Sequence, residues 1–188
     1  ILRVVRADAD ERVVSDEQVP VGETGEIIAS MMALDAFTGY WKRPDADEKS
    51  IREGWYFTGD LGRFDENGEV YVLGRVDDMI ISGGFNIWPA ELENVLAGHA
   101  DVLEVAVFGV PHERWGETPH ALCVVSENSE VTAEELIELV SSDLGSYKKP
   151  DSVTITTEPL PKSPVGKIKR KDLREPFWAG VDRRVSGS

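Results

Sequence analysis

The sequence predicts an α+β fold in which a β-rich first part precedes a smaller part that mixes strands and helices. Up to about residue 75, short apolar runs are bounded by polar turns, as in successive strands. After residue 75, strand-like and helix-like segments alternate. The change of pattern places a domain boundary near Arg75 to Asp78.

The first part contains two predicted strands and a hairpin. The strands cover residues 1–6 and 25–30, and the hairpin arms cover residues 61–65 and 69–74. Between the arms lies Glu66-Asn67-Gly68, in which the Asn-Gly pair is expected to supply the positive φ angles of a tight turn.

The second part alternates helices with buried strands. Pro89 begins a helix that runs to about Ala97, and Gly98 is expected to take the left-handed position at its end. Thr132 begins another helix, with Glu135 completing a capping box. The remaining predicted segments are strands over 102–110, 121–125 and 152–157, a loop over 159–166, a short helix over 170–177 and a frayed tail over 181–188.

Composition indicates a soluble globular protein, with 41% hydrophobic and 29% charged residues. No apolar run approaches the ~18 residues that a membrane span needs, and no signal-peptide pattern is present. The first residue is Ile1, so we expect a piece of a longer chain. The single cysteine, Cys123, excludes an internal disulfide and suits a reducing cytoplasm; its apolar surroundings favour a buried structural thiol.

The net charge of −15 is unevenly distributed. Acids dominate residues 1–147, which argues against nucleic acid or an anionic membrane as a partner. Basic residues outnumber acids between residues 148 and 174. This stretch is either a site for a small phosphorylated ligand or a solvated basic surface.

Four segments carry sequence motifs. They are Gly-Tyr-Trp at 39–41 with Gly-Trp-Tyr-Phe-Thr-Gly-Asp-Leu-Gly at 54–62, Leu-Gly-Arg-Val-Asp-Asp-Met-Ile at 73–80, Ser-Gly-Gly-Phe-Asn-Ile-Trp-Pro-Ala-Glu-Leu-Glu at 82–93, and Pro-Lys-Ser-Pro-Val-Gly-Lys-Ile at 161–168. In this order and spacing they resemble the adenylate-forming superfamily of acyl-CoA synthetases, luciferases and peptide-synthetase adenylation domains. Residues 82–93 are most similar to the acyl- and aryl-CoA ligases.

The resemblance implies a specific domain organisation. Residues 1–76 would be the C-terminal end of the large adenylating (AMP-binding) domain, closing a β-barrel-like subdomain. Residues 77–177 would form a small mobile C-terminal lid domain, with a mixed sheet flanked by helices, and residues 178–188 a tail.

It also implies an activity, that of a cytoplasmic acid-thiol ligase, with a fatty acid as the expected substrate. A carboxylate is joined to AMP with loss of pyrophosphate, and the thiol of CoA then attacks the mixed anhydride. The implied small molecules are ATP, Mg²⁺, CoA and a carboxylic acid, and a homo-oligomer is possible. The family's phosphate loop and acyl pocket lie outside this sequence, so the isolated chain is expected to be inactive and to hold no Mg²⁺ ligands.

Two residues resemble the family's AMP/ATP-binding residues. Asp60 would accept hydrogen bonds from the ribose hydroxyls, and Arg75 would bind the ribose or phosphate as a forked donor. Alternatively, Asp60 caps a turn and Arg75 forms a surface ion pair.

Lys167 resembles the catalytic lysine of adenylation, because its ammonium can reach the carboxylate and α-phosphate oxygens as charge builds on them. Its alternative is a solvated basic surface. Asp77 resembles the hinge residue about which the lid rotates, a role that requires a change of φ and ψ and no ligand contact.

Six residues resemble CoA-binding positions, namely Gly83, Gly84, Trp115, Tyr147, Lys148 and Lys149. The glycines would admit a thin pantetheine arm, and an indole could stack on adenine. The alternatives are an ordinary turn at the glycines and structural packing of the tryptophan. The three histidines, His99, His112 and His120, lack metal-ligand spacing and are expected to be surface or packing residues.

Two other functions stay open at this point. An enzyme that loads a carrier protein would use the same pantetheine thiol chemistry, and a non-catalytic α/β interaction module could retain these loops for structure alone. The combination of Lys167, Asp60 and Arg75 argues against the second, because a structural domain has no need of all three polar groups.

Overall fold

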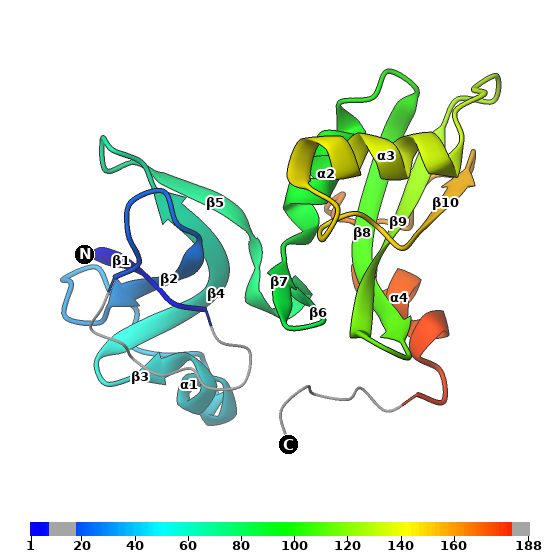
Figure 1. Cartoon of the computed structure of the whole chain (residues 1–188). Helices are drawn as coiled ribbons and strands as arrows, with labels where there is room; N and C mark the ends of the chain where they lie inside the picture. Colours follow the sequence, from blue (N-terminus) through cyan, green and yellow to red (C-terminus); the bar gives the residue numbers. More distant parts are fainter. Residues whose placement is uncertain (8–17, 182–188) are drawn as a thin grey trace. The chain divides into compact units, whose positions relative to one another are not determined.

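The structure is a computed structural model that describes residues 1–7 and 18–181. The chain divides into two compact units, Ile1–Asp77 and Asp78–Ser188. The division falls one residue beyond the boundary that the sequence places after residue 76. Each unit has its own sheet (Figure 1).

The first unit is an antiparallel sheet around one long strand. The order is β1-β2-β4-β3, and β5 shares with β3 the second edge of β4. The sheet curls as a half-barrel (Figure 1), and its core includes Val5, Ile28 and Phe57. The elements are β1 (Leu2–Val5), β2 (Gly25–Ser30), α1 (Pro44–Ser50), β3 (Ile51–Arg52), β4 (Trp55–Phe64) and β5 (Val70–Arg75).

The β4–β5 hairpin is confirmed, but its turn differs from the prediction. Gly68 has a positive φ of 80°, whereas Asn67 is not among the described residues with positive φ. Asp65 closes the turn instead, because its carboxylate accepts hydrogen bonds from the backbone N–H groups of Asn67 and Glu69. Only the glycine therefore supplies the left-handed conformation.

The second unit contains the mixed sheet that the sequence predicts. β9 lies at its centre: β8 pairs with one edge of β9, whereas β10 and β6 share the other edge and β7 lies beside β6. Among the described pairs, β9 and β10 run parallel and the others antiparallel. The strands are β6 (Ile80–Ser82), β7 (Phe85–Ile87), β8 (Val102–His112), β9 (Gly116–Val125) and β10 (Ser152–Thr156); the helices are α2 (Pro89–Ala97), α3 (Ala133–Leu144) and α4 (Arg170–Trp178).

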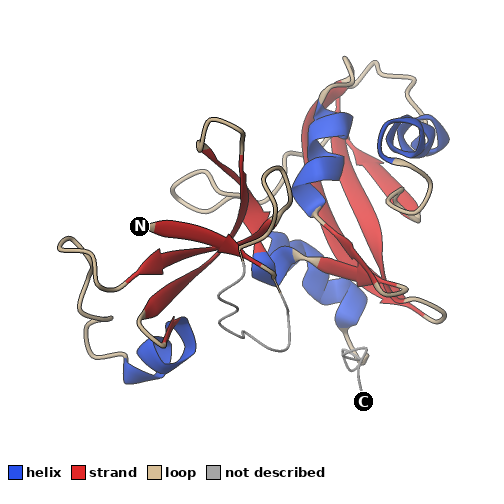
Figure 2. Ribbon diagram, turned by 60° about the vertical axis from the view of Figure 1, so that its left-hand side comes forward, coloured by secondary structure: helices blue, strands red, loops and turns tan. Residues whose placement is uncertain are grey.

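Both faces of this sheet are covered (Figure 2). On one face, Val107 and Cys123 belong to the core that includes Leu92 of α2 and Leu136 of α3. On the opposite face, the neighbouring residues Ala106 and Val124 contact a second cluster that includes Leu160, Ile168 and Leu173. The period of two along each strand thus separates the helices α2 and α3 from α4 and the segment that leads into it.

The predicted capping box of α3 is confirmed, because Thr132 Oγ1 accepts from the N–H of Glu135 and the Glu135 carboxylate accepts from the N–H of Thr132. The predicted left-handed cap at Gly98 is wrong: this residue has φ −72° and ψ −15°, which continue the helical conformation. Trp178, expected as the first tail residue, is the last residue of α4, and residues 182–188 of that tail lie outside the described residues.

Among residues 1–7 and 18–181, no helix has the length and apolar character required to cross a membrane.

Candidate functional site

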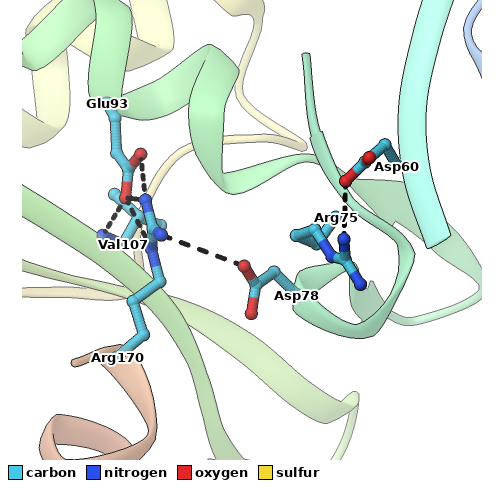
Figure 3. A network of polar contacts seen from close by, with 6 residues as sticks. All are labelled: Asp60, Arg75, Asp78, Glu93, Val107 and Arg170. Carbon is cyan, nitrogen blue, oxygen red and sulfur yellow. Dashed lines mark hydrogen bonds and ion pairs between the residues drawn. The ribbon is translucent and has the colours of Figure 1, made fainter. Parts of the chain in front are cut away.

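Asp60 and Arg75, both predicted to bind nucleotide, are cross-strand partners in the first unit. Arg75 Nη1 donates to Asp60 Oδ1 at 2.7 Å (Figure 3). The side chain of Arg75 remains 52% exposed and that of Asp60 37% exposed, so both stay available to a ligand. The predicted alternative of a surface ion pair for Arg75 therefore describes its contact in this structure.

The backbone that presents Asp60 is fixed by residues of β2. Glu26 is only 1% exposed, and its carboxylate accepts from the N–H of Gly59 at 3.0 Å. Thr58 Oγ1 donates to the carbonyl of Ile27 and accepts from the N–H of Asp60. We did not predict a role for Glu26; the signal was an acid placed directly before the apolar Ile27 of a predicted strand.

Three aromatic rings connect the 39–41 motif to β4, the strand that contains Asp60. Phe37 makes edge contacts with Tyr40 and Tyr56, and the two tyrosine hydroxyls are 2.8 Å apart. The bond from Tyr40, together with burial, raises the pKa of Tyr56 to about 12. Both motif segments of this unit thus belong to one packed region.

Asp77, the predicted hinge, lies in a short 3₁₀ turn (Val76–Asp78) and is the last residue of the first unit. The next residue, Asp78, lies 3.9 Å from Arg170 Nη1 within the second unit. The predicted hinge therefore coincides with the point where the chain passes from one compact unit to the other.

The second unit contains a hollow of about 200 Å³ beside the glycine turn. Four of the predicted CoA-binding residues line it, namely Gly83, Trp115, Tyr147 and Lys149. Phe85 and Asp151 also contribute to the lining. Aromatic surface and one ammonium group converge there, which suits an adenine ring and an anionic group.

Trp115 packs directly against the backbone of Gly83. The φ of Gly83 is +57°, and a Cβ atom there would lie 2.7 Å from Cε3 of Trp115. Trp115 is 42% exposed, and the Arg114 guanidinium lies 4.4 Å from the centroid of its indole. The structure thus supports packing of Trp115 on the turn and still leaves part of the indole accessible.

The other two predicted CoA-binding residues do not line the hollow. Gly84 has φ +87° and open space where its Cβ would be. Lys148 Nζ instead bonds Glu91 Oε2 at 2.5 Å, and both side chains are largely buried, at 17% and 29% exposed. In this structure Lys148 therefore connects the segment after α3 to α2.

Lys167 lies in a narrow hairpin between β10 and α4. Lys162 and Ile168 form an isolated antiparallel bridge at its base. Within the hairpin, the Ser163 N–H donates to the Lys167 carbonyl, and the Ser163 carbonyl accepts from the Gly166 N–H. The Lys167 N–H donates to Ser163 Oγ at 3.2 Å. Within the described part of the chain, the exposed Lys167 ammonium makes no ion pair, whereas Lys162 and Lys169 each pair with an acid.

The three histidines make packing or backbone contacts. His120 is 5% exposed, packs against Phe108 and Phe177, and hydrogen-bonds Ser152 Oγ at 2.7 Å. His112 Nδ1 accepts from two backbone N–H groups, as His99 Nδ1 does from one. No group of three or more His, Cys, Asp or Glu side chains able to hold a metal ion occurs in residues 1–7 and 18–181.

Comparisons with known proteins agree with this geometry. The AMP-binding enzyme C-terminal domain matches residues 91–167. The chain is 44% identical over 162 residues to the long-chain-fatty-acid–CoA ligase FadD13 of Mycobacterium tuberculosis, covering 86% of this chain and 31% of that protein. It is 43% identical over 163 residues to a feruloyl-CoA synthase of Amycolatopsis, covering 87% and 33%.

The fold is also similar to solved structures. ATP-bound MatB from Rhodopseudomonas palustris superposes with a TM-score of 0.82 and 31% identity over 94% of this chain and 34% of MatB. The chain thus spans about a third of the length of the proteins it matches. It belongs to the adenylate-forming superfamily. Within that class, it corresponds to the C-terminal region of the acyl-CoA ligases.

Proposed function

We propose that this chain is the C-terminal part of an ATP-dependent acyl-CoA ligase, with a fatty acid as substrate. In this proposal, residues 1–76 end the adenylating domain and residues 77–177 are its mobile lid. The observation that carries the proposal is the exposed ammonium of Lys167, which has no acid partner in the described chain although it lies in a well-bonded hairpin. A fixed loop that presents an unneutralised cation suits the stabilisation of a developing negative charge.

In the first half-reaction, a carboxylate oxygen of the acid attacks the α-phosphorus of ATP. The bond from that phosphorus to the bridging oxygen breaks, and pyrophosphate leaves with the electron pair. Lys167 would stabilise the negative charge on the carboxylate and α-phosphate oxygens. Asp60 would accept from the ribose hydroxyls through the oxygen that Arg75 does not bond, and Arg75 would hold that carboxylate in place.

In the second half-reaction, the CoA sulfur attacks the carbonyl carbon of the acyl-adenylate, AMP leaves, and the thiol proton passes to solvent. The hollow beside Gly83 would receive CoA, with Trp115 and Tyr147 against the adenine and Lys149 near a phosphate. Rotation about Asp77 would present this surface after adenylation. Mg²⁺ would neutralise the ATP phosphates, and we assign it no ligand in this chain.

The test is a pair of half-reactions measured with the complete enzyme. Lys167→Ala should lower pyrophosphate release about 100- to 1000-fold, the usual range for loss of one preorganised donor. Thioester formation from supplied acyl-adenylate should change little. Lys171→Ala is the matched control, because Lys171 is also an exposed lysine of this basic segment. Equal loss of both half-reactions in Lys167→Ala would contradict the assignment.

The acid is identified by AMP release with a panel that contains fatty acids of graded length and ferulate, with and without CoA. CoA-dependent turnover that peaks with one fatty acid supports the proposed substrate. A preference for ferulate would change the substrate and keep the ligase. If AMP release stalls until a pantetheinylated carrier protein is added, the carrier protein takes the place of CoA as the acceptor. The 188-residue chain alone should release no pyrophosphate.

A further inference from the structure

The hairpin that carries Lys167 is attached to the body of its unit on both sides. Its two arms leave from the bridge between Lys162 and Ile168, and the backbone N–H of Lys169 donates to the carbonyl of Pro161 at 2.9 Å. Ile168 packs on the cluster of Ala106, Val124 and Leu160. The hairpin is therefore well defined internally, and its position depends on what its arms contact.

The first arm is held by Glu104 of β8. Lys162 Nζ lies 2.6 Å from Glu104 Oε1, and the N–H of Leu160 donates to Oε2 at 3.4 Å. The hydrogen bond from Lys162 lowers the pKa of Glu104 despite an opposing effect of burial. One carboxylate thus bonds both a side chain and the backbone of the arm that enters the hairpin.

The second arm is held by Glu93 of α2 (Figure 3). Arg170, the first residue of α4, donates from Nη2 to both Glu93 oxygens at 2.8 and 2.7 Å, and from Nε to Oε1 at 3.2 Å. Oε1 also accepts from the N–H of Val107 at 2.9 Å. Burial lowers the pKa of Arg170, but its bonds and charge contacts with Glu93 outweigh this effect and raise it overall.

Strand β8 is common to both contacts. Glu104 is one of its residues, and the Glu93 carboxylate accepts from the N–H of Val107 in β8. We propose that Glu93 and Glu104 are positioning residues that fix the Lys167 hairpin to β8 and so set where the ammonium acts during adenylation. This inference rests on the proposed role of Lys167. Neither carboxylate would touch a substrate; each would act through Lys162 or Arg170.

The geometry favours positioning over a contribution to stability. The Lys162 and Glu104 side chains are 41% and 27% exposed, and solvent-exposed ion pairs contribute little to folding. The distance of a catalytic group from the reacting atoms matters far more, since a displacement of about 1 Å can cost roughly 100-fold in rate. Loss of the Glu104 anchor should thus change the rate of adenylation more than the stability of the unit. The Arg170–Glu93 pair is more buried, at 32% and 14% exposed, so for Glu93 the comparison of the two half-reactions separates positioning from stability.

Glu93→Gln and Glu104→Gln are the informative variants. In each, the amide oxygen can still accept from the backbone N–H of Val107 or Leu160, while the charge that binds Arg170 or Lys162 is removed. Asp172→Asn is the matched control, because it removes the charge of the exposed Lys169–Asp172 pair without touching either anchor. These variants keep nearly the same side-chain volume, which limits disruption of the fold.

Two measurements test the inference. In the 188-residue chain, amide hydrogen exchange of residues 163–169 should accelerate in Glu93→Gln and Glu104→Gln and stay unchanged in Asp172→Asn. In the complete enzyme, adenylation should fall about 10- to 100-fold in either Gln variant. Thioester formation from supplied acyl-adenylate should stay within about twofold, and neither variant should lower adenylation further once Lys167→Ala is present.

The possible failures are distinguishable. Unchanged hairpin exchange and unchanged adenylation, while Lys167→Ala remains strongly impaired, would overturn the positioning role and leave the proposed function intact. Equal loss of both half-reactions in the Gln variants would identify a destabilised unit and also overturn it. Full adenylation by Lys167→Ala would overturn the proposed function, and the positioning role with it.

Discussion

The indole of Trp115 lies where a side chain at Gly83 would have to be. A Cβ atom at Gly83 would be 2.7 Å from Cε3 of Trp115, and the N–H of Gly83 donates to the Trp115 carbonyl at 3.1 Å. The absence of a side chain at Gly83 therefore determines the position of the indole and, with it, the shape of the hollow.

Gly83→Ala should displace Trp115 and weaken CoA binding by the complete enzyme about tenfold, as expected for loss of one stacking contact. Indole emission should shift to longer wavelength as the ring becomes more hydrated. Gly84→Ala separates strain from collision, because Gly84 has φ +87° and no atom within 4 Å of an added Cβ. Equal weakening of CoA binding by both variants would show that backbone strain, and not the indole, is responsible.

Asp60→Asn should affect nucleotide binding more than stability. The Asp60–Arg75 pair is exposed, so we expect a change in unfolding free energy below about 1 kcal/mol. The Asp60 carboxylate would accept hydrogen bonds from the ribose hydroxyls. Its replacement by a neutral amide should weaken AMP binding by the complete enzyme about tenfold, measured by calorimetry. Asp45→Asn, which disrupts the similarly exposed Arg43–Asp45 pair, should leave AMP binding unchanged. An unaltered affinity in Asp60→Asn would exclude its ribose contact.

His120 should make the stability of the chain depend on pH. Burial lowers the pKa of His120 in the folded state, so the unfolded chain takes up a proton first as the pH falls. The stabilisation is complete above the unfolded value of about 6.5 and is lost between that value and the lower folded pKa, by at most about 1.4 kcal/mol per pH unit.

The measurement compares urea unfolding of the chain and of His120→Gln at pH 7.5 and 5.5. Between pH 7.5 and pH 5.5, the free energy of unfolding of the unmodified chain should fall more than that of the variant, because glutamine does not titrate and can still bond Ser152 Oγ. If the free energies of unfolding of the chain and of the variant change in parallel with pH, His120 has the same proton affinity in the folded and unfolded states.

Cys123 should be unreactive while the chain is folded. The thiol is 0% exposed, and burial raises its pKa to about 11. The thiolate fraction near pH 8 is then about 100-fold lower than for a free cysteine, in addition to the lack of access. Ellman's reagent should detect one thiol per chain in denaturant and essentially none without it. Rapid labelling of the folded chain would contradict the described packing.

Elements with a strong period or a cap were predictable from the sequence. The capping box of Thr132 and the start of α2 at Pro89 are found where expected. α1 was missed because its sequence, Pro-Asp-Ala-Asp-Glu-Lys-Ser, has no apolar stripe, and none of its residues is buried. β6 and β7 were missed because three-residue strands are too short to show a period of two.

The motifs identified individual residues, but not their partners. Nothing in the local sequence of Lys148 indicates that it bonds Glu91, which is 57 residues away in the chain. The same holds for the contact of Glu93 with Arg170, over 77 residues. Such pairings depend on the tertiary arrangement of α2, α4 and the segment after α3, which periodicity and spacing do not encode.

The central place of β9 has a consequence for synthesis on the ribosome. One edge of β9 pairs with β8, and the other is shared by β6 at Gly116 and β10 at His120 to Val124. Because β10 ends at Thr156, this sheet cannot be completed until that residue has left the exit tunnel. Until then the backbone N–H and C=O groups of β9 from His120 to Val124 lack their β10 partners, and this unpaired edge can pair with a strand of another chain.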